Sequence, residues 1–282
     1  MIKIISDSTC DLSKELLEKY NIAIRPLYVH LGEDEYIDGV NVTPDDLYAW
    51  ADANKSTPKT SVFSLPEAME LFQTYTDAGD EIIAFSVSDE MSSSGNVMRM
   101  AAEELGKEDS IHVINSASLS TGIGLLIIEA AIMAENGVPA AEIVARIEEL
   151  KPLVRASFVV DTLTYLHRGG RCSGIAALAG GMLKLHPKIV VADGKMGPEK
   201  KYRGKMKSVI MDYVKDMEED LKRAKSDRVF ITHSGCDAEV VEMVREYLQG
   251  LNVFGEILET RAGSVISSHC GPGTLGVLFI AQ

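Results

Sequence analysis

The first half of the chain alternates short β-branched segments with segments that carry apolar residues at helical spacing. Four runs are typical of strands, at residues 2–6, 22–31, 81–87 and 111–115. The stretches between them repeat apolar residues every three or four positions, as amphipathic helices do. Because strands that alternate with helices are joined by crossover connections, this pattern predicts a largely parallel sheet covered by helices.

Capping residues mark two helix starts in this half. Thr43 precedes a proline in the expected first turn, and Ser64 with Glu67 three positions later forms a capping box that also contains a proline. Apolar residues then recur at i, i+4 and i+7 over residues 65–72. This spacing predicts a helix with one buried face.

The second half mixes strands and helices in a different order. Strands are expected at residues 155–160, 189–192, 228–232, 254–259 and 276–280, and helices at 162–168, 206–224 and 238–248. Asp193 and Gly194 follow an apolar run, and an Asp-Gly pair in this position is a strong hairpin signal. The sequence therefore predicts an α/β unit with a mixed sheet.

The change of pattern near Lys151 and Pro152 predicts two α/β domains, residues 1–153 and 154–282. A length of 282 residues suits two domains of ordinary size. No segment rich in Gly or Ser joins them, so we expect the domains to share a substantial interface. Interfaces of this kind often hold ligands.

Charge and cysteine content limit the partners and the compartment. The chain has 42 acidic and 28 basic residues, a formal net charge of −14, which makes nucleic acid a poor candidate partner. The four cysteines are scattered without a CxxC pair, as suits a reducing cytosol. Asp7 comes too early for a secretory signal, and the longest apolar run, residues 123–133, is too short to span a bilayer. We expect a cytoplasmic protein without stable membrane insertion.

Four polar segments lie where strands of the first half are expected to end. They are residues 6–9, 59–64, 91–96 and 115–122. The carboxyl ends of parallel strands form the ligand crevice of an open α/β sheet, so these segments should converge. Hydroxyl groups and helix N-terminal N–H groups can hold an anion there. The alternative interpretation is structural, because Ser and Thr before a helix often serve as ordinary N-caps.

Sequence signatures of common catalytic sites are missing. Residues 271–276 match GxGxxG, but only six residues follow, so no dinucleotide-binding βαβ unit can form and the segment is expected to be a tight turn. The chain has no P-loop, GxSxG or HExxH motif. Five histidines are dispersed and suggest no metal site: His30, His112, His167, His186 and His233. We expect neither a metal nor a cofactor.

Motifs in a fixed order along nearly the whole chain resemble those of one family. They are Asp7-Ser8 with Asp11, Thr60-Ser61 with Ser64, Met91-Ser92-Ser93 before residues 99–103, residues 116–124, residues 163–166 with Gly169-Gly170-Arg171, Lys188, Asp193-Gly194, Arg203-Gly204-Lys205 and residues 269–273. In these motifs the chain resembles the DegV family, whose members are fatty-acid-binding proteins and, where placed in a pathway, the lipid-carrying subunit of bacterial fatty acid kinase. The resemblance implies a two-domain DegV-like α/β fold with the ligand between the domains.

The resemblance also implies a head-group site. Thr60 and Ser92 match the family's carboxylate-binding hydroxyls, and His269 matches a histidine that assists, as a protonated or tautomer-fixed donor. Residues 62–63 stand where the family has Gln-Pro, and residues 93–94 where it has Gly-Thr. Arg171 follows a double glycine and is expected to point toward the head group or the domain seam. The expected carboxylate-binding residues are Thr60, Ser61, Ser92, Ser93, Arg171 and His269.

By this resemblance the protein is a non-catalytic carrier of one long-chain fatty acid. It would present the carboxylate to a separate fatty acid kinase, which forms the acyl phosphate. The acyl tail needs a long apolar cavity, for which residues 122–128 and 175–182 are the expected lining. One alternative is a hydrolase that uses Ser92 as nucleophile and His269 as base. Another is an interaction module with a narrow, empty interior.

One segment opposes the overall charge. Residues 168–207 hold ten basic and two acidic residues, a net charge of +8, which leaves −22 for the rest of the chain. Such asymmetry is typical of an interaction surface. In the family, the basic turn after the hairpin is associated with docking of the kinase subunit, which here implies Lys201, Arg203 and Lys205. A solvated hairpin tip is the alternative.

Overall fold

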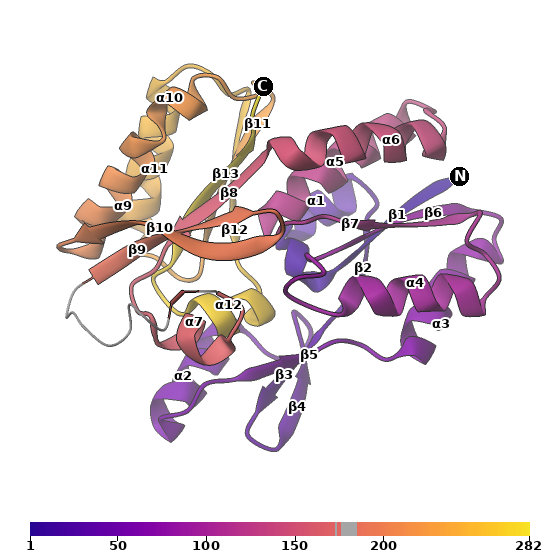
Figure 1. Ribbon diagram of the computed structural model, residues 1–282, viewed down its shortest axis with the longest axis horizontal. Coiled ribbons are helices and arrows are strands. Elements are labelled where there is room, and N and C mark those ends of the chain that lie inside the picture. The colour runs from indigo at the N-terminus through magenta and orange to yellow at the C-terminus, as the bar shows by residue number, and fades with distance from the viewer. Residues whose placement is uncertain (173, 176–184) are drawn as a thin grey trace.

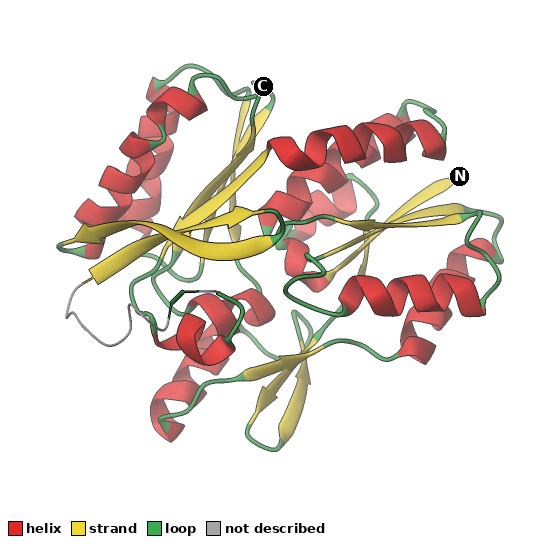
Figure 2. Ribbon diagram, in the orientation of Figure 1, coloured by secondary structure: helices red, strands yellow, loops and turns green. Residues whose placement is uncertain are grey.

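Figure 1 shows the computed structural model of the protein, which describes residues 1–172, 174–175 and 185–282. In these ranges the strands form three sheets, of four, six and three strands. The four-stranded sheet is parallel and the six-stranded sheet is mixed, and helices cover both (Figure 2). The predicted α/β class is confirmed.

The four-stranded sheet comes from the first half of the chain. Its order is β2, β1, β6, β7, formed by Ala23–Arg25, Ile2–Asp7, Glu81–Ser86 and Ile111–Asn115. Helices α3 and α4 lie on one side of it in Figure 1, and α1, α5 and α6 pack on the other. These helices are Leu65–Thr76 and Ser94–Glu104, and Lys14–Lys19, Thr121–Glu135 and Ala140–Leu150.

Both faces of the parallel sheet are buried, because alternate residues of a strand point to opposite sides. Ile4 and Ile83 belong to the core on the α5 side, whereas Ile5 and Ile82 belong to the core on the α3 side. Phe72 of α3 lies in the latter core and is 1% exposed. The helix face predicted over residues 65–72 therefore covers the sheet, and the middle residues of β1 and β6 are apolar on both faces.

A small antiparallel sheet lies beside the parallel one. Its central strand β3 (Tyr28–Leu31) pairs with β4 (Asp34–Ile37) and with β5 (Lys59–Ser61), and α2 (Pro44–Asn54) connects β4 to β5. The prediction of one strand over residues 22–31 is wrong, because the segment splits into β2 and β3 of different sheets. Pro26 lies at the split and has no N–H to donate to a ladder.

The six-stranded sheet comes from the second half. Its order is β10, β9, β8, β13, β11, β12, formed by Lys195–Arg203, Leu185–Ala192, Val154–Val159, Leu275–Ile280, Arg228–His233 and Glu256–Arg261. β11 and β12 are parallel and the other pairs are antiparallel, so the sheet is mixed as predicted. Asp193 and Gly194 have φ values of 49° and 77°, as a type I′ turn requires, and the predicted hairpin is confirmed.

Helices α9 (Met206–Asp216), α10 (Glu218–Leu221) and α11 (Ala238–Gly250) cover the outer face of the mixed sheet. The prediction of one helix over residues 206–224 is wrong in one respect. The helix breaks at Met217, whose φ and ψ of −95° and 2° are not helical. The positions expected on its inner face are all buried: Val209, Ile210, Tyr213, Val214, Met217 and Leu221.

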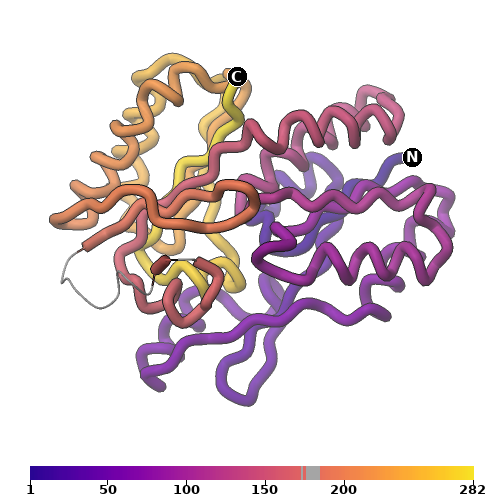
Figure 3. The backbone as a smooth tube through the Cα atoms, viewed as in Figure 1, coloured from indigo at the N-terminus to yellow at the C-terminus, as the bar shows by residue number. Residues whose placement is uncertain are grey.

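Helix α5 lies between the two large sheets, as the backbone tube of Figure 3 shows. It contacts β1 and β6 on one side and β8 and β13 on the other. Residues 121–128 of this helix are buried on every side, which explains their apolar sequence.

Two short helices complete the structure. α7 (Thr164–Gly169) confirms the helix expected near residues 162–168, and it packs against α12 (Ser264–Cys270), which the sequence analysis missed. α12 also contacts α2, β3 and β5, so a C-terminal segment lies against elements of the first half. The chain passes from one large sheet to the other at the 3₁₀ turn Lys151–Leu153, and the domain division at residue 153 stays a prediction. No helix in the described ranges has both the length and the apolar character needed to cross a membrane.

Candidate functional site

A cavity of about 330 Å³ lies between the carboxyl ends of the parallel strands, the mixed sheet and α12. All four polar segments identified in the sequence line it, through Thr9, Ser61, Ser92 and Ser120 among others. The predicted convergence is confirmed. One segment differs from expectation, because residues 59–61 form β5 rather than a loop at the end of a parallel strand.

The cavity wall includes every residue expected to hold a carboxylate. β5 and the segment before α4 supply hydroxyl groups, the segment after α7 supplies a guanidinium group, and α12 supplies an imidazole. Residues that are far apart in the sequence thus meet at one cavity. They are Thr60, Ser61, Ser92, Ser93, Arg171 and His269.

His269 points one ring nitrogen at Thr60. Its Nε2 lies 2.9 Å from the Thr60 hydroxyl oxygen, while Nδ1 is buried without a hydrogen-bond partner. Burial, and secondarily the charge of Arg171, lower the pKa of His269 to about 4. A buried N–H without a partner is rarer than a buried acceptor without one, so the proton belongs on Nε2. A neutral ring with its proton on Nε2 corresponds to the tautomer-fixed donor of the two forms expected.

This tautomer leaves the Thr60 hydroxyl proton available to a ligand, because Nε2–H donates to the Thr60 oxygen. The Ser92 hydroxyl oxygen accepts from the backbone N–H of Ser94 at 3.3 Å, so its proton is available as well. The Ser61 hydroxyl, in contrast, is 2.8 Å from Nε2 of His30 in the small sheet. Arg171 is exposed, and its guanidinium donates to the Gly169 carbonyl at 2.6 Å, which keeps it at the cavity rim.

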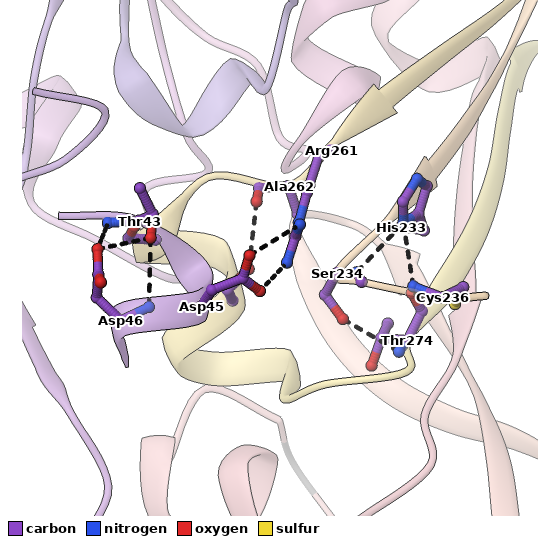
Figure 4. A network of polar contacts seen from close by, with 12 residues as sticks. Thr43, Asp45, Asp46, His233, Ser234, Cys236, Arg261, Ala262 and Thr274 are labelled. Atoms are coloured by element: carbon purple, nitrogen blue, oxygen red, sulfur yellow. Dashed lines mark hydrogen bonds and ion pairs between the residues drawn. The ribbon is translucent and has the colours of Figure 1, made fainter. Parts of the chain in front are cut away.

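Other hydroxyl groups of the cavity wall donate hydrogen bonds to groups within the protein. Thr9 donates to Asp7, Ser120 to Asp11, and Thr274 to the Cys270 carbonyl, at 2.5, 2.5 and 3.0 Å. Figure 4 shows Ser234 close to Thr274, whose backbone N–H donates to the Ser234 hydroxyl oxygen. The Ser234 hydroxyl proton itself goes to the carbonyl of Gly271. These groups therefore add little polarity toward a ligand.

The rest of the wall is largely apolar, but it is not the lining that the sequence predicted. Residues 122–128 belong to α5 and form core between the sheets, and none of them lines the cavity. Of residues 175–182, Ile175 is a buried core residue and the others lie outside the described ranges. The mixed sheet, α7, α12 and connecting segments of the first half provide the apolar surface instead, through Leu27, Val87, Met91, Leu119, Phe158, Leu166, Met196, Val265, Ile266 and Leu278.

The geometry does not form the nucleophile and base of the hydrolase alternative. Nε2 of His269 bonds Thr60 and Nδ1 bonds nothing, so neither ring nitrogen bonds Ser92. A catalytic base also needs a third group that orients it, and the partnerless Nδ1 has none. Within the described ranges, no group of three His, Cys, Asp or Glu side chains is placed to hold a metal ion.

The basic segment lines the cavity through Arg171 and Met196, and its charge is partly neutralised. Four of its lysines form ion pairs, Lys188 with Glu199, Lys195 with Glu90, Lys200 with Asp216 and Lys207 with Glu239. The three predicted docking residues, Lys201, Arg203 and Lys205, are exposed at the end of β10 and just after it. They do not line the cavity.

Gly169, the last residue of α7, sets the place of the His269 ring. A Cβ atom at this position would lie 2.5 Å from Nδ1 of His269, so Gly169→Ala must displace the ring or the helix. Loss of the bond between His269 and Thr60 is expected to weaken binding of a carboxylate ligand by about three- to tenfold. Isothermal titration of lipid-free protein with oleate measures this change.

Gly250→Ala is the matched control for that substitution. A Cβ atom at Gly250, at the end of α11, would meet nothing within 4 Å. We expect its affinity to equal that of the unchanged protein. Equal affinity of the Gly169→Ala protein would show that the ring position does not matter.

Together, the fold and the cavity define an α/β protein with a cavity between a parallel sheet and a mixed sheet. A family model described as an uncharacterised protein of the DegV family matches residues 1–282. The chain belongs to the DegV family, as its motifs predicted.

The chain matches known relatives over nearly the whole length of both proteins. A DegV domain-containing protein of Clostridium perfringens is 33% identical over 292 residues, which cover 99% of this chain and 97% of the relative. A solved Thermus thermophilus structure, described as fatty acid binding of a DegV family protein, is 26% identical, with a TM-score of 0.92 and coverage of 100% and 99%. A stearic acid-binding protein of Eubacterium ventriosum is 31% identical, with a TM-score of 0.87 and coverage of 100% and 98%.

Proposed function

We propose that the protein binds one long-chain fatty acid in this cavity, with the carboxylate at Thr60, Ser92 and His269. The observation that carries the proposal is the distribution of available protons. In the described wall, Thr60 and Ser92 have hydroxyl protons to give, whereas most other hydroxyls donate within the protein. A ligand with one anionic end and an apolar body fits this arrangement. The fatty-acid-binding structures of relatives support the same class of ligand.

The head group would be held by a relay of donors. Nε2–H of His269 donates to the oxygen of Thr60, and the Thr60 hydroxyl donates to the carboxylate. Ser92 supplies a second donor, and Arg171 at the rim supplies positive charge. A buried carboxylate is costly unless such donors replace its water, and hydrogen bonds to a charged acceptor are stronger than neutral ones.

The hydrocarbon tail would supply most of the driving force. Burial of a methylene contributes roughly 0.8 kcal/mol, so about 16 methylenes give on the order of 10 kcal/mol before the costs of association. The apolar side chains from β8, β13 and α12 form the surface against which the tail would pack.

The lipid that accompanies the purified protein tests this proposal. Native mass spectrometry is expected to show a complex with one long-chain fatty acid, and solvent extraction should identify it. No stoichiometric lipid, together with no binding when lipid-free protein is titrated with C16 and C18 acids, would overturn the proposal. Chain length and unsaturation follow from the same measurement.

We further propose that the protein acts as a carrier in the cytoplasm that presents the carboxylate to a separate kinase subunit. The exposed group Lys201, Arg203 and Lys205 would dock that subunit, because it lies away from the cavity and carries positive charge without lining the site. Presentation requires no chemistry by the carrier, and neither ring nitrogen of His269 bonds Ser92.

Arg203→Ala is expected to leave the fatty acid affinity unchanged and to lower the rate of acyl phosphate formation by a cognate kinase subunit about tenfold, since this equals the loss of roughly one charged contact. Lys222→Ala, which removes an exposed cation directly after α10, is the control and should change neither quantity. Fluorescent fatty acid titration and a coupled kinase assay measure the two effects. Loss of lipid affinity in the Arg203 variant would contradict the separation of the two surfaces.

A further inference from the structure

The N-terminus of α12 is capped by carboxylates from the first half of the chain. The N-cap residue is Gly263, which has no side chain to cap the helix. Its backbone N–H donates to Oδ1 of Asp11 at 2.8 Å, and the N–H of Ser264 donates to Oδ1 of Asp38 at 2.8 Å. Two residues more than 200 positions away thus satisfy the first N–H groups of the helix that carries His269.

The absence of a side chain at Gly263 allows both carboxylates to approach. A Cβ atom there would lie 3.3 Å from Oδ1 of Asp11 and 3.3 Å from both carboxylate oxygens of Asp38. The second oxygens are also engaged, since Ser120 donates to Asp11 at 2.5 Å and Ser8 to Asp38 at 2.8 Å. Each carboxylate therefore joins α12 to a fixed part of the first half.

Backbone strain accompanies this contact. Asp11 and Ser120 both have positive φ, 51° and 53°, and Ser120 has a ψ of −143°, outside the ordinary left-handed region. Backbone conformations of this kind are unfavourable, and they persist where the surrounding structure holds them. The bond between Asp11 and Ser120 joins the two strained residues, and Ser120 itself lines the cavity.

The contacts of Asp11 and Asp38 with α12 affect the head-group site because the same short helix carries His269. His269 lies five residues after Ser264, about 7.5 Å along the axis. β5, which carries Thr60, and the segment that carries Asp11 both belong to the first half. A displacement of α12 relative to that half would therefore separate His269 from Thr60, now 2.9 Å apart.

We infer that Asp11 and Asp38 are positioning residues, which hold α12 so that His269 meets Thr60. Both residues accept hydrogen bonds from the backbone of α12, and neither is required to touch the fatty acid. The consequence for lipid binding rests on the proposed function, whereas the placement of the ring does not. The two can be tested separately.

The ring signals of His269 in lipid-free protein report the placement. Nitrogen-15 NMR should show a neutral ring with an Nε2–H that exchanges slowly with solvent, assigned by its loss in His269→Gln. In Asp11→Ala we expect this proton to exchange about tenfold faster, because a bond of roughly 1.4 kcal/mol is lost. Asp11→Asn keeps an acceptor for Gly263 and should retain the signal of the unchanged protein.

Asp7→Ala is the control for a merely structural effect. Asp7 is equally buried and accepts four hydrogen bonds, from the N–H and hydroxyl of Thr9, the N–H of Val87 and the hydroxyl of Ser94, none of them from α12. We expect it to lose stability without a change in the His269 signal. If Asp11→Ala does not fold, Gly263→Ala replaces it, since its Cβ pushes on both carboxylates.

An unchanged His269 signal in a folded Asp11→Ala or Gly263→Ala protein would overturn the inference, as would an equal change in Asp7→Ala. A shifted signal in the Asp11 or Gly263 variant alone supports it. Oleate affinity should follow the same order, with Asp11→Ala weaker than Asp11→Asn. If the unchanged protein binds no fatty acid, the proposed function fails, and the ring signals still decide the positioning role.

Discussion

Thr60→Val is expected to weaken binding of a long-chain fatty acid by about 10- to 100-fold, because a hydrogen bond to a charged group contributes about 1.5–3 kcal/mol. Valine keeps the shape of threonine and removes the hydroxyl. The substitution removes the donor to the carboxylate and leaves Nε2–H of His269 without its acceptor. Ser92→Ala removes the second donor, and the double variant should retain almost no affinity. Titration of lipid-free protein with a fluorescent C16 or C18 acid measures the change.

Ser61→Ala is the matched control. Ser61 is adjacent to Thr60 in β5 and also lines the cavity, but its hydroxyl bonds Nε2 of His30. Its removal should change the affinity less than about threefold, because no donor to the carboxylate is lost. Equal losses in the Thr60 and Ser61 variants would indicate a general disturbance of β5, and no loss in the Thr60 variant would place the carboxylate elsewhere.

The relay also predicts that Thr60 and His269 act together. If His269 works through Thr60, then His269→Gln should cost little affinity in a protein that already carries Thr60→Val. Additive losses would mean that His269 contacts the carboxylate by itself. This double-mutant cycle separates the relay from two independent donors.

Local chemistry explains why much of the fold and the site could be predicted from the sequence. The hairpin at residues 193–194 follows from backbone preferences of Asp and Gly, and the α3 start follows from the bonds that the N–H and hydroxyl of Ser64 donate to Glu67. Convergence of the polar segments follows from parallel strands having their carboxyl ends at one edge. These are properties of short segments or of sheet geometry, and they do not depend on distant contacts.

The features that were missed depend on distant contacts. α12 has a glycine at its N-cap, and the groups that cap it lie at residues 11 and 38, so no local signal marks its start. Residues 122–128 are as apolar as a lipid-binding wall, and only the position of α5 between two sheets makes them core. A helix buried in the core and a helix that lines a lipid cavity are equally apolar, so composition could not distinguish the two.

His269 is expected to make the folded protein sensitive to acid. Its pKa is lowered from the ordinary value of 6.5 to about 4, mainly by burial and also by the charge of Arg171. Between these values the unfolded chain binds a proton that the folded protein does not, so stability falls as pH decreases from 6.5 to 4 and is constant above 6.5. The expected loss is about 3 kcal/mol, at 1.36 kcal/mol for each unit of pKa.

The buried Asp side chains change the pH dependence of stability in the opposite direction. The quantity to measure is therefore the difference in unfolding free energy between the unchanged protein and a His269 variant. Burial raises the pKa of the Asp11 carboxyl group above its ordinary value of 3.8, and the bonds from Ser120 and Gly263 lower it in part. A raised pKa contributes stability that is present below the ordinary value and is lost as pH rises through the raised one.

Urea unfolding of lipid-free protein and of His269→Gln, from pH 4 to pH 8, separates the two contributions, because Asp11 is common to both. We expect the stability of the unchanged protein relative to the variant to rise by about 3 kcal/mol between pH 4 and 6.5, and then to stay level. If the unfolding free energies of the two proteins change with pH in parallel, His269 binds its proton equally well in the folded and unfolded states. The ring would then be protonated near pH 6, and the donor relay through Thr60 would have to be replaced by a direct ion pair with the carboxylate.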